Sequence, residues 1–169
     1  EIQFGILKRL RGAPIARHTA AFGLRFNPAP PYNILATDRI GFGQMQELSR
    51  FSRYWDILAN SGRFPRGLAL LLGDSPFRRF LAFARWLYAR TGQTHALAHE
   101  RVVHLLHEYL IAELGLAEAE ASAALIADYR GTGGRSRLRF EDGDAALPPP
   151  RPSRRKGHTP ERQSRHLRA

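Results

Sequence analysis

Four histidines crowded into one stretch are the first residues whose types and spacing suggest chemistry. They are His95, His99, His104 and His107. His104 and His107 are three residues apart and would share one face of a helix, and His95 and His99, four apart, would do so if that helix starts early. Neither pair has a carboxylate or a third ligand on its face, and His104-Leu-Leu-His107-Glu is not the order of a zinc protease. We therefore predict no metal site and expect these histidines on a solvated, partly buried helix face.

Other common catalytic patterns do not occur in the sequence. Ser49, Ser52 and Ser61 lack a positioned base, and there is no Gly-x-Ser-x-Gly elbow. The run Gly131-Thr-Gly-Gly follows an expected helix, whereas a phosphate-binding loop follows a strand. We therefore predict no catalytic residue within this chain.

A polar turn is the main candidate for a binding site. It consists of Asn60, Ser61, Gly62 and Arg63, with Arg66 close behind. In one interpretation, Arg63 donates hydrogen bonds to the carbonyl groups that a helix end leaves unpaired. In the other, its planar fork of donors holds an anionic group of a substrate or cofactor. Asn60, Ser61, Arg63 and Arg66 are thus candidates for substrate binding or for contact with another domain.

The candidate turn follows a segment that we expect to form the central helix. Its apolar residues recur every three or four positions, which is the spacing of one helix face. Gly62 can adopt the left-handed conformation that ends a helix, and Pro65 prevents simple continuation. We expect this face to lie in the core, with Trp55 at its middle. The face consists of Met45, Leu48, Phe51, Trp55 and Leu58.

Three further segments have helical periodicity. One begins at Ser75-Pro76 and ends at Thr91-Gly92, one runs from about Leu97 to Leu114, and one runs from Glu118 to Tyr129. With the central helix they predict a mainly α fold, a bundle of about four helices within residues 41–140. The expected inward face of the first segment is Phe77, Phe80, Leu81, Ala84, Leu87 and Tyr88.

The start of the chain has the alternation of a half-buried strand. We expect the bulky residues to pack against helices and the residues between them to face the opposite side. The bulky set is Ile2, Phe4 and Ile6, and the set between them is Gln3 and Gly5. A basic loop completes residues 1–17, and residues 18–40 are predicted to be an ordered linker because their prolines favour extended backbone.

The end of the chain lacks apolar periodicity. Residues 141–169 are predicted to be a disordered basic tail, with seven Lys and Arg residues from Pro148 onward against one acid, Glu161. The whole chain of 169 residues has a net charge of +11. This charge allows an alternative function, an independent basic helical module that binds nucleic acid. No recognition-helix pattern supports that alternative.

Two long phrases carry a resemblance to a known family. The phrase Arg50-Phe-Ser-Arg-Tyr-Trp-Asp-Ile-Leu-Ala-Asn-Ser-Gly-Arg-Phe resembles a helical domain of unknown function in cobalamin-binding radical SAM proteins, which are also called Fe–S oxidoreductases. The phrase Glu1-Ile-Gln-Phe-Gly-Ile-Leu-Lys-Arg-Leu-Arg-Gly-Ala-Pro-Ile resembles the last barrel strand and following loop of the same family. The resemblance implies that residues 1–17 end a radical SAM barrel, whose lumen Gln3 and Gly5 would face next to the cofactor.

The resemblance also implies a chemistry for the whole protein. A [4Fe–4S] cluster would cleave S-adenosylmethionine, and cobalamin is a candidate carrier of a methyl group. Cluster iron is held by Cys thiolates, and this chain contains no Cys. The expected partners are therefore an upstream radical SAM barrel and a cobalamin-binding domain of the same polypeptide. The helical domain would cover or shape the site for substrate or cofactor.

Targeting signals are absent from the sequence. No segment approaches the ~18 apolar residues needed to span a bilayer, and no signal peptide pattern begins the chain. Without Cys there is also no sign of an oxidising compartment. We expect a cytoplasmic protein without a membrane partner.

Overall fold

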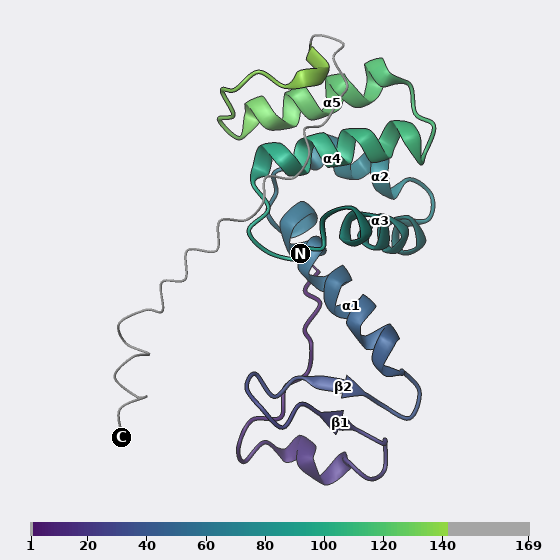
Figure 1. Ribbon diagram of the computed structural model, residues 1–169, viewed down its shortest axis with the longest axis vertical. Helices are drawn as coiled ribbons and strands as arrows, with labels where there is room; N and C mark the ends of the chain where they lie inside the picture. Colours follow the sequence, from purple (N-terminus) through teal and green to yellow (C-terminus); the bar gives the residue numbers. More distant parts are fainter. Residues whose placement is uncertain (1, 142–169) are drawn as a thin grey trace, which may run out of the picture.

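The computed structural model describes residues 2–141. The described part is mainly helical, with five α-helices and one two-stranded sheet near the start, as the predicted fold class requires. In Figure 1 the sheet lies at one end of the molecule and α5 at the other. The elements are β1 (Arg25–Phe26), β2 (Ile34–Ala36), α1 (Phe42–Trp55), α2 (Pro65–Leu72), α3 (Pro76–Thr91), α4 (His99–Ala112) and α5 (Glu118–Gly131).

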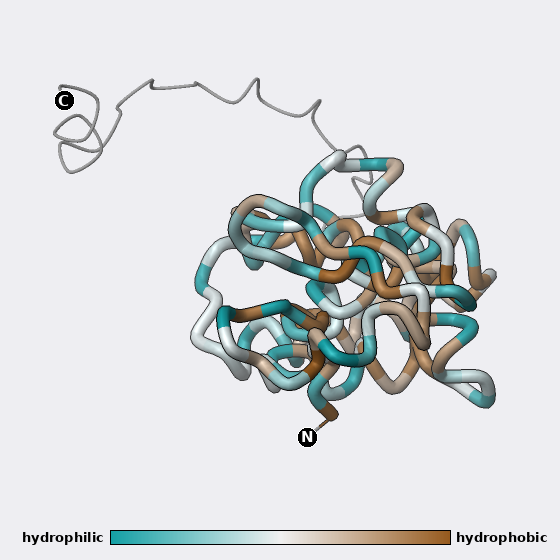
Figure 2. Tube along the Cα trace, turned by 90° about the horizontal axis from the view of Figure 1, so that it is seen from below, coloured by the Kyte–Doolittle hydropathy of each residue, from teal (hydrophilic) through white to brown (hydrophobic). Residues whose placement is uncertain are grey.

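The helices α1 to α5 share one hydrophobic core, and we refer to these five helices together as the bundle. Helix α1 packs against α3, α4 packs against α5, and α2 contacts α3, α4 and α5. In Figure 2 apolar and polar stretches alternate along the chain, as expected of amphipathic helices. Each fully buried large apolar side chain stabilises the fold by roughly 1.5–3 kcal/mol. The largest of them include Tyr54, Leu58, Phe64, Leu71, Phe80, Phe83, Leu87, Leu106, Leu110 and Leu125.

The central helix ends where the sequence predicts. Helix α1 continues into one π-helical turn, Asp56–Asn60, and Gly62 then adopts a positive φ of 66°. Only glycine adopts such a backbone conformation without steric cost. Trp55, however, is only partly buried and packs at the edge of the core, whereas its neighbour Tyr54 is fully buried. The prediction that Trp55 lies at the middle of the buried face is therefore wrong by one position.

The structure corrects two further details of the bundle. Pro65 does not merely interrupt the helix, because it is the first residue of α2, where a missing N–H group costs nothing. On α3 the buried residues include Phe83, while Phe77 is 55% exposed and Tyr88 also faces solvent. Phe83 packs against Tyr109 of α4, with 5.0 Å between the ring centres.

Residues 2–40 form a separate structural region, the N-terminal lobe. Within it β1 and β2 pair as an antiparallel hairpin, with Arg25 opposite Ala36 and Phe26 opposite Ile34. The predicted strand over Ile2–Ile6 is not formed, because no described segment pairs with it. The strand content lies instead in the region predicted to be a linker.

The bundle closes at its C-terminal side with a short turn. The 3-10 turn Arg139–Glu141 packs Phe140 and Leu138 into the core, and Glu141 pairs with Arg130 at 2.7 Å. The rest of the predicted disordered tail, residues 142–169, lies outside the described residues. In the part that the structure describes, every helix is too short or too polar to cross a membrane.

Candidate functional site

The polar turn after α1 is held together mainly by its own side chains. The Asn60 amide donates to Asp56 Oδ1 at 2.9 Å, one turn earlier. The Ser61 hydroxyl donates to the Ile57 carbonyl at 2.7 Å and accepts the Arg63 N–H at 3.3 Å. Ser61 thus satisfies a carbonyl group at the helix end, Asn60 bonds only the Asp56 side chain, and Arg63 does not bond the helix carbonyls with its side chain.

Arg63 and Arg66 differ in their surroundings. The Arg63 guanidinium makes no hydrogen bond or ion pair with the residues that the structure describes, so its donors face solvent. Burial lowers the pKa of His99, and the nearby charge of Arg63 lowers it further. The Arg66 side chain is 63% exposed and lies 3.7 Å from Asp128 Oδ1. Arg63 is therefore the turn residue that remains available for an anionic partner.

Asp128 is the main residue of this region that the sequence reasoning missed. Its buried carboxylate accepts the N–H of Gly67 at 2.8 Å and the N–H of Arg66 at 3.1 Å. These are donors at the first turn of α2, where a helix leaves N–H groups unpaired and favours negative charge. A signal was present, since Asp128 shares the buried face of α5 with Ala121 and Leu125.

Gly67 allows this contact because it lets α2 approach α5. A Cβ atom at Gly67 would lie 2.5 Å from Leu125 Cδ2 and 3.2 Å from Leu106 Cδ2. A real Cβ atom does not approach another atom to 2.5 Å, so a larger residue would require the side chains of Leu125 and Leu106 to shift. Gly67 and Asp128 thus connect the first turn of α2, directly after the polar turn, to α5.

The histidines of α4 are more buried than predicted. His104 and His107 lie in the core side of α4, so the expectation of a solvated face is wrong for both. His104 Nδ1 lies 2.8 Å from the Glu100 carbonyl, and its Nε2 accepts the Arg139 N–H at 3.2 Å. The His107 ring stacks on Phe140 with 3.8 Å between ring centres. Both histidines fasten the closing turn onto α4.

His99 occupies an aromatic environment. The centre of its ring lies 5.2 Å from the ring centre of Phe64 and 5.3 Å from that of Tyr129. Its buried Nε2 has no hydrogen-bond partner in the described part. A buried histidine without a partner carries its charge poorly, which agrees with the lowered pKa. His95 is exposed. Among the described residues no three His, Asp or Glu side chains are grouped to hold a metal ion.

The start of the chain lies on the central helix. Ser52 Oγ donates to the Phe4 carbonyl, and Trp55 Nε1 donates to the Ile2 carbonyl at 3.1 Å. The Phe4 ring meets the Phe51 ring edge-on at 5.0 Å. The two side-chain donors explain why these positions of α1 are a serine and a tryptophan.

An apolar groove of about 460 Å³ runs between this segment and α1. Gln3 and Gly5, the residues predicted to face a cofactor, are both exposed and lie in the wall of this groove. The other walls are apolar, and they include Leu7, Met45, Leu48 and Phe77.

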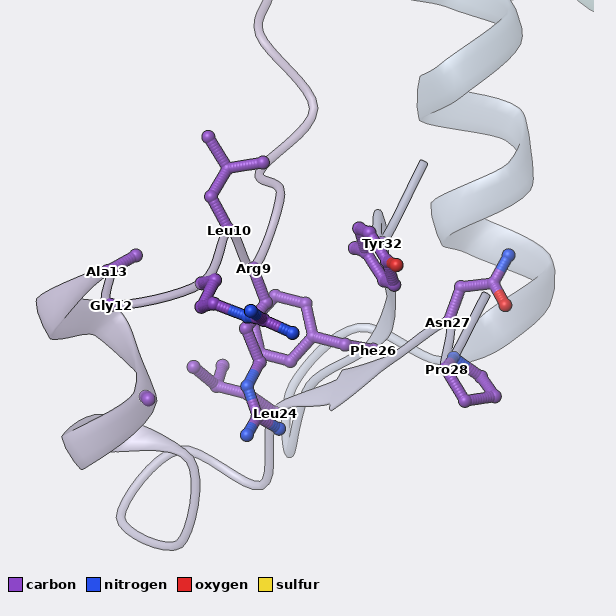
Figure 3. Close-up of a pocket in the computed structure, with 11 residues that line it drawn as sticks. Arg9, Leu10, Gly12, Ala13, Leu24, Phe26, Asn27, Pro28 and Tyr32 are labelled. Atoms are coloured by element: carbon purple, nitrogen blue, oxygen red, sulfur yellow. The ribbon is translucent and has the colours of Figure 1, made fainter. Parts of the chain in front are cut away.

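A second pocket lies within the N-terminal lobe. Its volume is about 690 Å³, and it lies between residues 9–16 on one side and 24–32 on the other. Figure 3 shows Arg9, Phe26 and Tyr32 gathered around the same hollow, with Leu24 below them. Arg11 and Asn27 also line it, and no acidic residue does. Sequence reasoning identified the basic loop but not the aromatic residues opposite it.

Comparison with known proteins identifies a family. A family profile described as "Protein of unknown function (DUF4080)" matches residues 20–139, which include both hairpin strands and all five helices. No curated protein and no solved structure gives a significant match. The matched segment covers more than two-thirds of the sequence. The chain therefore belongs to the family described as "Protein of unknown function (DUF4080)".

Proposed function

We propose that this chain is the C-terminal accessory part of a cobalamin-dependent radical SAM enzyme. In this role it covers or shapes the site for substrate or cofactor next to the barrel. The catalytic groups belong to the preceding barrel and cobalamin-binding domain of the same polypeptide. The proposal extends the resemblance of two phrases in the sequence, at residues 1–15 and 50–64.

The contact between the start of the chain and α1 supports the proposal most strongly. The segment that resembles the end of a barrel lies directly on the helix that resembles the helical domain. Two side chains of that helix, Ser52 and Trp55, bind carbonyl groups of the segment, and Phe4 packs against Phe51. Two phrases that are about 50 positions apart in the chain thus meet in one contact. Such a contact would fix the angle at which the bundle follows a barrel.

The surface of the same segment supports the proposal. Ile2 is 59% exposed and Leu10 is 60% exposed, and Leu7 between them also faces solvent. Single exposed apolar residues are common, but a row of them on one extended segment is typical of a covered surface. A barrel packed against residues 2–10 would cover these side chains.

The residues of this chain do not fit an iron–sulfur ligand set. The sequence has no Cys, and the described part has no other group of side chains suited to a metal. When bound elsewhere in the polypeptide, the cluster would supply reductive cleavage of S-adenosylmethionine. This chain would contribute shape and charge rather than ligands, and Arg63 is its best placed cation.

A substitution of Arg63 can distinguish a role of this residue in ligand binding from a role in the fold. In the full-length protein, Arg63→Lys keeps the charge and loses the planar fork of donors. Because the Arg63 side chain makes no bond within the described residues, we expect unchanged thermal stability and weaker binding of an anionic substrate. Normal binding together with lower stability would assign Arg63 to the fold alone.

The decisive experiment concerns the polypeptide that precedes residue 1. We expect its coding sequence to contain a Cys-x-x-x-Cys-x-x-Cys motif and the purified full-length protein to cleave S-adenosylmethionine under reducing conditions. The double variant Ser52→Ala and Trp55→Phe should keep cluster absorption while product formation falls. The absence of that cysteine motif upstream would overturn the proposal.

A further inference from the structure

We propose that the pocket of the N-terminal lobe binds a free nucleotide, meaning a nucleoside mono- or diphosphate. The pocket is formed by residues 9–16 and 24–32 alone. The proposal is therefore independent of the accessory role of the bundle, and either can fail without the other.

The charge of the lobe indicates an anionic ligand. From Ile2 to Thr37 the sequence contains five Lys and Arg residues and no Asp or Glu. Arg9 and Arg11 both line the pocket, and neither pairs with a carboxylate of the described residues. Guanidinium groups bind phosphate through charge-assisted hydrogen bonds, so two of them without a counter-charge at one hollow favour a phosphate ligand.

The lining of the pocket also contains surface suited to a flat ring. Phe26 and Tyr32 both line the pocket, and Leu24 and Pro28 extend the apolar surface (Figure 3). Aromatic faces bind nucleobases by stacking without a strict requirement for one base. Positive charge and ring surface thus line the same cavity, and a nucleotide contains a group suited to each.

The walls of the pocket are fixed by backbone contacts. The Arg9 N–H donates to the Tyr32 carbonyl at 2.9 Å, and the Tyr32 N–H donates to the Ala29 carbonyl at 2.9 Å. Tyr32 has a positive φ of 57°, which a residue with a side chain rarely adopts. The two hydrogen bonds fix the backbone of Tyr32 in this conformation, and its side chain lines the pocket.

Further donors are available for the polar part of a ligand. Asn27 Oδ1 accepts the Ala29 N–H at 3.1 Å, which fixes the side chain and leaves its Nδ2 group as a donor. The backbone N–H groups of Arg11 and Gly12 make no hydrogen bond to the described residues. A cavity of about 690 Å³ is in the size range of small-molecule sites and larger than phosphate alone needs.

Calorimetric titration of the 169-residue chain with ADP at low salt tests the proposal. We expect Arg9→Gln combined with Arg11→Gln to weaken binding about tenfold or more, because charge-assisted hydrogen bonds to phosphate are lost. The matched control is Arg17→Gln combined with Arg25→Gln, which removes the same charge from the same lobe outside the pocket. The control should change affinity by less than about twofold, because distant exposed charges are screened.

Two comparisons separate the nucleotide from simpler explanations. Phe26→Leu should weaken ADP binding and leave the binding of inorganic phosphate unchanged. Amide chemical shifts on adding ADP should change at residues 9–13 and 24–32, and unaltered spectra elsewhere report intact folding of each variant.

Three outcomes would overturn the proposal. Equal losses in the two double variants would mean attraction by charge alone. Affinity for ADP no higher than for inorganic phosphate would remove the role of the aromatic wall. Binding of a short single-stranded oligonucleotide without binding of ADP would assign the lobe to nucleic acid instead.

Discussion

The bundle and the N-terminal lobe are built on different principles. The core cluster lies entirely in residues 51–140, and Ile34 is the single buried apolar residue of the lobe. Of the nine large apolar side chains that are exposed in the described part, six lie in the lobe. The bundle is thus stabilised by its own apolar packing, whereas the lobe presents apolar surface outward. This difference predicts that substitutions in the bundle lower stability more than substitutions in the lobe.

The bundle and the N-terminal lobe also differ in how their charged residues are paired. In the bundle, Arg85 pairs with Glu47 at 2.8 Å and Arg90 pairs with Glu108 at 2.7 Å. The lobe has basic residues and no acid before Asp38. Several charges of the bundle are paired internally, whereas no ion pair among the described residues involves a basic residue of the lobe.

The largest difference between the two regions should appear on removing one aromatic ring. Phe80 is fully buried, so Phe80→Ala should lower the free energy of unfolding by about 3–5 kcal/mol. Phe22 in the lobe is 53% exposed, and Phe22→Ala should change the free energy of unfolding by less than about 0.5 kcal/mol. Urea unfolding followed by circular dichroism measures both. Similar losses for the two variants would contradict the division.

The contact between Asp128 and α2 should give the next largest effect. Asp128→Ala leaves the buried N–H of Gly67 without an acceptor, and we expect a loss of about 1.5–3 kcal/mol in stability. Asp128→Asn keeps one acceptor oxygen and should lose less. Asp74→Ala, at an exposed site before α3, is the control, with an effect below about 0.5 kcal/mol. A loss at Asp74 equal to that at Asp128 would argue against the capping role.

Trp55 joins the two regions and should give a smaller, localised effect. Trp55→Phe keeps the ring packing and removes the hydrogen bond to the Ile2 carbonyl, which contributes about 0.5–1.5 kcal/mol. Amide exchange should become faster over residues 2–7 and stay unchanged in α3, α4 and α5. Faster exchange throughout the bundle would mean that Trp55 belongs to the main core.

The pH dependence of the bundle should give the smallest effect. Burial lowers the pKa of His107 below 6.5, with an opposing influence of Glu118 and a further lowering by His104. The unfolded chain then binds more protons than the folded chain below pH ~6.5. Stability is therefore complete above that pH and decreases as the pH falls toward the folded pKa. Unfolding curves of His107→Gln at pH 7.5 and 5.5 should show a smaller decrease than those of the parent, and an unchanged decrease would exclude His107 as a cause.

The helices were predictable because their signals are local. Repeats of three and four residues and the stops at Gly62 and Gly92 locate α1 and α3 from the sequence alone. Local signals do not show on which side of a helix a neighbouring element will pack. Phe83, rather than Phe77, is buried on α3, where it packs against Tyr109 of α4, a helix that follows later in the chain.

The candidate site depends even more on distant contacts. Asp128 reaches Gly67 across 61 positions of the chain, and Ser52 reaches Phe4 across 48. No local pattern connects such residues. His99, His104 and His107 lie on α4 as predicted, whereas His95 lies before the helix begins, so His95 and His99 do not share a helix face. The burial of His104 and His107 follows from the closing turn at Phe140. The roles suggested for Gln3, Gly5 and the turn residues remain predictions.

Amide hydrogen exchange of the full-length protein tests the central claim most directly. The account predicts that residues 2–10 exchange much more slowly in the full-length protein than in the 169-residue chain, because a barrel covers their exposed apolar side chains. Helices α3 to α5 should exchange equally in both, because their core is complete within this chain. Equal exchange of residues 2–10 in the two proteins would contradict the proposed packing of this domain onto a barrel.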